Sequence, residues 1–137
     1  MEGKNILVID GQGGGIGKQV VYALKGRFPG VSVTAVGTNT LATSAMLKAG
    51  ADNGATGENA VIVGCRKADI IVGPIGIAIA DSLFGEVTPK MALAVGQSHA
   101  RRILIPVNHC DNMIAGVEEI SMGRLVESAV SLAGAVL

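Results

Sequence analysis

The chain has 137 residues, which is the size of one domain (expected over residues 1–137) and too short for two full ones. Eleven Lys and Arg residues balance eleven Asp and Glu residues, and this zero net charge argues against a general nucleic-acid binder, which needs a basic face. The two histidines and two cysteines lack metal-site spacing, so we expect neither a metal site nor a disulfide scaffold.

We expect no segment for export or membrane insertion in this sequence. Its most apolar stretch, residues 70–80, is shorter than the roughly 20 residues of a membrane span. The first residues enter a strand-like segment directly instead of a signal peptide, so we expect a soluble, cytoplasmic protein. Because 49% of the residues are hydrophobic, we also expect a homo-oligomer in which a second copy covers apolar surface.

The first half of the chain alternates strand and helix signals. Residues 4–10 (KNILVID) are a short apolar run ended by a glycine, which predicts a buried strand. A glycine-rich loop then leads into apolar residues at helical spacing over residues 16–28. Residues 31–37 predict a second strand, and residues 40–49 predict a helix that Gly50 ends.

The second half continues the alternation. Residues 58–67 contain a β-branched core, yet their length and position favour a crossover helix. Residues 69–73 predict a third strand and residues 102–107 a fourth. Between them, Thr88 followed by Pro89 predicts the start of a helix that runs to about residue 98.

The last elements decide the fold prediction. Residues 113–117 resemble a short strand, and a parallel crossover from residues 102–107 would need a dozen or more residues, so we expect an antiparallel pair. Ser121 then caps a helix that runs to about residue 135. The alternation predicts a three-layer, Rossmann-like α/β fold with helices on both faces of a mostly parallel sheet of about five strands. The expected strand order is 2-1-3-4-5, with the last strand antiparallel at an edge.

The glycine-rich loop DGQGGGIGK lies between the first strand and the first helix. Free N–H groups and the helix dipole favour an anion there, and a lysine adds positive charge. Five glycines in seven positions exceed the needs of a turn, although glycine required only for packing is the alternative. The residues expected to bind a phosphate here are Asp10, Gly11, Gln12, Gly13, Gly14, Gly15, Ile16, Gly17 and Lys18.

The loop matches no standard nucleotide motif. The pattern G-x-G-x-x-G fails in both registers, because Ile16 or Lys18 takes the place of its last glycine. The P-loop pattern fails because Gln12 replaces a glycine and Gln19 replaces the hydroxyl residue that holds magnesium. The second strand ends at residues 37–39 without the acid that binds the ribose of NAD. The motifs therefore assign no particular cofactor, and a nucleotide such as NAD(P) is one candidate.

The carboxyl ends of the other strands carry further candidates, because these ends meet at one edge of a parallel sheet. Thr38 and Asn39 could bond a ribose or an amide, or cap the next helix. Residues 86–90 are interpreted as surface and capping residues around another helix start. His109 is a candidate for proton transfer, and Cys110 for a nucleophile beside it. The remaining residues expected at this edge are Gly73, Pro74, Ile75, Gly76 and Asn108.

Five strings resemble a family of short bacterial proteins of unknown function with a Rossmann-like core: VIDGQGGGIGKQ, GTNTLATSAMLKAGADNGATGEN, ADIIVGPIGI, GEVTPKM and ILIPVN. The resemblance covers nearly the whole chain and implies the fold and the position of the site, but no reaction. It also implies that GTNTLATSAM and GATGEN belong to one site. The residues that it adds are Thr38, Asn39, Thr43, Ser44, Thr56, Glu58 and Asn59, of which Glu58 is also a candidate for catalysis.

The sequence thus predicts a protein that binds a phosphate-bearing small molecule, such as a nucleotide, at the loop after the first strand. We expect no nucleic-acid or membrane partner. The alternatives are an NAD(P)-linked oxidoreductase that acts as a homodimer, a P-loop-like phosphoryl-transfer protein, and a structural subunit that joins a partner through apolar surface.

Overall fold

A computed structural model describes residues 4–107 and 112–137. Its five strands form one parallel sheet in the order β3-β2-β1-β4-β5, the order of a Rossmann-type fold. The strands are β1 (Asn5–Asp10), β2 (Ser32–Gly37), β3 (Asn53–Thr56), β4 (Ile70–Pro74) and β5 (Arg101–Ile105). The helices are α1 (Gly15–Arg27), α2 (Thr40–Lys48), α3 (Glu58–Lys67), α4 (Pro89–Gln97), α5 (Met122–Val136) and the short 3₁₀ helix η1 (Ile75–Ala78).

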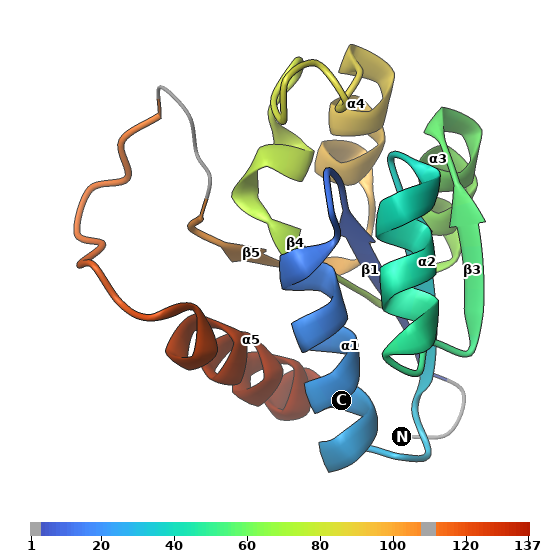
Figure 1. The fold of residues 1–137 in the computed structure, drawn as a ribbon, viewed down its shortest axis with the longest axis vertical. Helices are drawn as coiled ribbons and strands as arrows, with labels where there is room; N and C mark the ends of the chain where they lie inside the picture. Colours follow the sequence, from blue (N-terminus) through green and yellow to red (C-terminus); the bar gives the residue numbers. More distant parts are fainter. Residues whose placement is uncertain (1–3, 108–111) are drawn as a thin grey trace.

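The sheet separates two apolar cores. Side chains of a strand alternate between its faces, so Ile6 and Val8 of β1 join one core while Leu7 and Ile9 join the other. Helices α1, α2 and α5 cover the first core, with α1 between the other two (Figure 1). Helices α3 and α4 cover the opposite face. This burial on both sides explains why β1 is a continuous apolar run.

The prediction of an antiparallel last strand was wrong. Residues 113–117 form no strand and belong to the irregular segment that leads into α5 (Figure 1). The fifth strand is β3, which pairs in parallel with β2 at the other edge. All four residues of β3 are exposed, so its sequence, NGAT, carries no apolar pattern. The order of the other four strands, and the helix over residues 58–67, agree with the predictions.

Side-chain caps fix where three helices begin. Asn39 accepts the backbone N–H of Ala42 at the start of α2. Thr88 and Ser121 cap α4 and α5 as predicted. Among the described residues, no helix is long and apolar enough to cross a membrane.

The packing of β4 against β1 makes a first prediction. A Cβ on Gly73 would collide with the carbonyl oxygen of Ile9 and would lie 2.8 Å from Cδ1 of Ile77. Gly73→Ala should therefore lower the free energy of unfolding by about 1–3 kcal/mol. Gly26→Ala, at an exposed position in α1 with open space around it, is the control and should raise it by about 0.4–1 kcal/mol. Urea denaturation checks both, and equal stabilities would contradict the packing argument.

Candidate functional site

The glycine-rich loop folds around a buried carboxylate at the end of β1. Asp10 is 3% exposed, and its Oδ1 and Oδ2 accept the N–H groups of Gly11 and Gly17 at 2.8 and 2.7 Å. Burial raises the pKa of Asp10, while hydrogen bonds from Gly17, Gly11 and Ile16 act to lower it. The carboxylate thus takes N–H groups at the start of α1 that an external anion would otherwise meet.

A second carboxylate joins the loop to the end of β2. Glu86 Oε1 accepts the N–H of Gln12 at 2.8 Å, Oγ1 of Thr38 at 2.6 Å and Nδ2 of Asn39 at 2.7 Å. Burial acts to raise the pKa of Glu86, but these hydrogen bonds outweigh it and hold the pKa below its usual value. Within the described part of the chain, no donor is bonded to Oε2 of Glu86.

Packing explains three of the five loop glycines. A Cβ on Gly14, whose φ is +74°, would lie 2.9 Å from Cα of Ala42 on α2. A Cβ on Gly17 would press against Met46 at 2.5 Å. A Cβ on Gly11 would lie 2.9 Å from both Glu86 Oε1 and Leu83 Cδ1. These positions need glycine because the loop lies close to its neighbours, whether or not a ligand binds.

Packing does not explain Gly13 and Gly15. Both are exposed, a Cβ on either would meet nothing within 4 Å, and neither has a left-handed φ. Their N–H groups have no acceptor among residues 4–107 and 112–137. Two backbone N–H groups at the start of α1 are therefore open to solvent. Local packing gives no reason why these two positions should be glycine.

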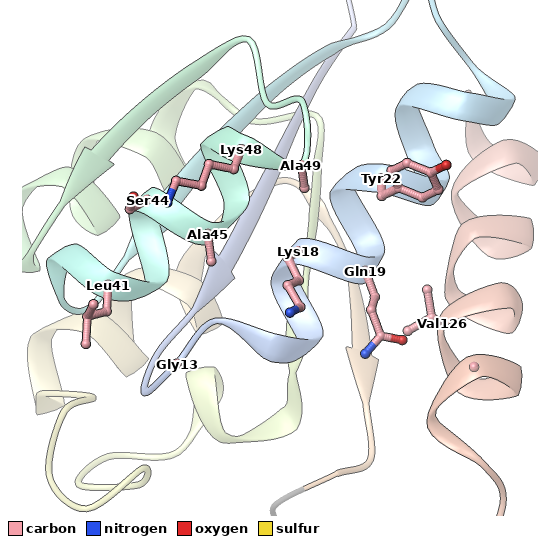
Figure 2. Close-up of a pocket in the computed structure, with 11 residues that line it drawn as sticks. Gly13, Lys18, Gln19, Tyr22, Leu41, Ser44, Ala45, Lys48, Ala49 and Val126 are labelled. Atoms are coloured by element: carbon pink, nitrogen blue, oxygen red, sulfur yellow. The ribbon is translucent and has the colours of Figure 1, made fainter.

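Two hollows meet at this part of the loop. A groove of about 790 Å³ runs along α1 between α2 and α5, and a smaller hollow of about 200 Å³ lies directly at the loop. Both are lined by Gly13 and Gln19. Lys18 on α1 and Lys48 on α2 line the groove (Figure 2), and Lys18 is the one in the first turns of α1, close to the loop.

The segments GTNTLATSAM and GATGEN lie together at the carboxyl edge of the sheet. Oγ1 of Thr43 and Oγ1 of Thr56 are 2.7 Å apart, which ties α2 to β3. Glu58 Oε2 accepts the hydroxyl of Thr88 at 2.6 Å and so joins α3 to α4. Ser44 lines the groove, whereas Asn59 is exposed on α3.

The remaining predicted residues lie elsewhere. Gly73, Pro74 and Gly76 are buried where β4 passes into η1, and the carbonyl of Gly76 accepts the hydroxyl of Ser82. Ile75, the first residue of η1, is half-buried. None of these four lines either hollow. The positions of Asn108, His109 and Cys110 fall outside the described residues.

Sequence reasoning missed Glu86. The sequence indicates surface and capping residues at positions 86–90, and Thr88 is indeed the cap of α4. The three donors to Glu86 lie 74, 48 and 47 positions away in the sequence. No local pattern indicates such a contact; the only available signal was that GEVTPKM is one of the strings of the family resemblance.

Fold and loop together define a Rossmann-like α/β protein with an open glycine-rich loop. The chain belongs to a family described as a domain of unknown function, DUF3842, whose model matches residues 5–137, and this confirms the resemblance. A comparison with curated proteins gave no match. One similar solved structure is a dodecameric FMN-dependent UbiX-like decarboxylase from Escherichia coli O157:H7, with 20% identity and a TM-score of 0.44 over 96% of this chain and 76% of that chain.

The two groups of glycines should respond differently to alanine. Gly14→Ala places a Cβ at a left-handed φ and against α2, so it should lower the free energy of unfolding by about 1–3 kcal/mol. Gly15→Ala, in open space at the first position of α1, should leave it unchanged or raise it by about 0.4–1 kcal/mol. Thermal denaturation of both variants checks this, and an equal loss in both would show that Gly15 is also required for packing.

The hydrogen bonds of Glu86 predict a pH dependence. A carboxyl group whose pKa is lowered by folding stabilises the folded state above its unfolded pKa of about 4.5. That contribution is lost as the pH falls through the lower, folded value. Glu86→Gln should therefore be less stable than the wild type at pH 7, with a difference that shrinks below about pH 4. Urea denaturation across this pH range checks it, and a pH-independent difference would contradict it.

Proposed function

We propose that the protein binds a phosphate-bearing small molecule, with the phosphate at the start of α1. The observation that carries the proposal is the pair Gly13 and Gly15, which lack side chains in open space and present N–H groups without an acceptor in the described structure. A helix N-terminus favours an anion through these free donors and through the helix dipole.

The surrounding charges restrict where an anion can bind. Asp10 and Glu86 already occupy the N–H groups of Gly11, Gln12 and Gly17, so they leave only the outer side of the loop. That side faces the groove that Lys18 and Lys48 line. The one ion pair of the described residues joins Lys25 to Asp52, so neither groove lysine is neutralised by one. The positive charge of Lys18 and the open donor of Gly13 therefore coincide in the groove, and Gly15 lines the smaller hollow that meets it.

The groove supports a nucleotide as the ligand. Its volume of about 790 Å³ lies within the 300–1,000 Å³ that is typical of small-molecule sites. Leu41 and Tyr22, each 74% exposed, present apolar surface on which a base can pack. Ser44 and Gln19 add polar groups along the same groove. The proposal concerns binding and assigns no catalytic residue.

Titration of the protein with pyrophosphate and with a panel of ribonucleoside mono- and triphosphates tests the proposal. At least one should bind, with about 2.7 kcal/mol of stabilisation at a hundredfold excess over Kd. Gly13→Ala and Gly15→Ala should weaken binding at least about 10-fold without loss of stability, because a Cβ blocks close approach of the phosphate. Lys18→Gln should weaken binding and reduce its salt dependence.

Gly26→Ala is the matched control, since it adds the same methyl group to α1 away from the loop, and it should bind as the wild type does. A flat response to the whole panel would overturn the proposal. If Gly13→Ala, Gly15→Ala and Lys18→Gln all bind the ligand as tightly as the wild type does, the ligand binds elsewhere.

A further inference from the structure

The end of β2 has a special role in nucleotide sites of this topology. In Rossmann-type proteins an acidic residue there accepts hydrogen bonds from the ribose hydroxyls of the ligand. Here β2 ends at Gly37 and is followed by Thr38 and Asn39, so the chain has no acid of its own at that point. A ribose at this place would find only a hydroxyl and an amide.

The fold brings a carboxylate to this place from the other side of the sheet. Glu86, which follows β4 and η1 in the chain, lies 2.6 Å from Oγ1 of Thr38 and 2.7 Å from Nδ2 of Asn39. The same oxygen is 2.8 Å from the N–H of Gln12, the residue before the open glycine Gly13. A carboxylate therefore lies beside the end of β2, next to the proposed phosphate position.

The carboxylate is held in one orientation. All three donors bind Oε1, which leaves Oε2 without a donor among the described residues. An ionised carboxylate only accepts hydrogen bonds, so Oε2 keeps the capacity to accept the hydroxyl groups of a ligand. Because the protein already fixes Oε1, the Glu86 side chain loses little conformational freedom when Oε2 accepts a hydrogen bond from a ligand.

The segment that carries Glu86 is strained. Asp81, Leu83 and Phe84 have left-handed φ values of 67°, 55° and 55°, which cost energy in residues other than glycine. Leu83 is 3% exposed and packs where a Cβ on Gly11 would lie, so Gly11 leaves room for both Leu83 and Glu86.

We infer that Glu86 is a specificity-determining residue whose Oε2 accepts the ribose hydroxyls of the ligand, so that the site takes ribonucleotides in preference to deoxynucleotides. The inference rests on the proposed function and adds the class of sugar that the site recognises. The two neighbouring hydroxyl groups of a ribose are donors that suit a carboxylate oxygen fixed beside a phosphate site.

The first experiment changes only the ligand. The ribonucleotide that binds most tightly in the panel is compared with its 2′-deoxy and 2′,3′-dideoxy counterparts by calorimetry on the wild-type protein. The dideoxy compound should bind about 10- to 100-fold more weakly, as expected for the loss of hydrogen bonds to a charged group. Equal affinities would overturn the inference.

The second experiment changes the acceptor. Glu86→Gln should bring the ratio between ribo- and dideoxynucleotide close to one, while Glu127→Gln, which makes the same change at an exposed position on α5, should keep the wild-type ratio. If Glu86→Gln instead strengthens the binding of both compounds equally, Glu86 competes with the anion and the inference is wrong. Should this variant fail to fold, Glu86→Asp keeps the charge on a shorter side chain and should lower the ratio.

These outcomes separate the two proposals. Suppose that pyrophosphate and deoxynucleotides bind as tightly as the ribonucleotide, and that Gly13→Ala and Gly15→Ala weaken binding as expected. The proposed function would then stand, and the role of Glu86 would be overturned. Absence of binding by any probe would overturn both.

Discussion

The arrangement of the site depends on the hydrogen bonds between Asp10 and the backbone at the start of α1. A carboxylate that is 3% exposed is unfavourable unless donors surround it, and Gly11 and Gly17 provide two of them. This contact fixes the direction in which the chain leaves β1 and enters α1. It also divides the loop: the inner N–H groups bind the protein itself, whereas those of Gly13 and Gly15 lie on the open side.

Glu86 extends this constraint across the carboxyl edge of the sheet. It connects the loop after β1 with the residues after β2, although its own segment follows β4. Two carboxylates beside an anion site would repel a phosphate if it approached the inner loop. The groove side avoids this conflict, because Lys18 and Lys48 lie there. The electrostatics therefore favour a phosphate on the groove side of the loop over one on its inner side.

The sequence predicts the elements whose signals are local. β1, β2, β4 and β5 each contain several apolar or β-branched residues, and the caps Thr88 and Ser121 act within a few residues of the helices that they begin. β3 escapes prediction because an exposed edge strand buries no side chain and needs no apolar pattern. Residues 113–117 mislead because Met113 is apolar yet 94% exposed. The contacts of Glu86 depend on the tertiary fold, so they become visible only in three dimensions.

The glycine-rich loop shows how the number of glycines can overstate a functional signal. Gly11, Gly14 and Gly17 are required by close neighbours, so they need no ligand to explain them. Only Gly13 and Gly15 then indicate a function. Each forgoes about 0.4–1 kcal/mol that alanine would provide in an unstrained, open position. An external group that approaches the backbone closely accounts for that cost, and the free N–H groups at these positions favour a negatively charged one.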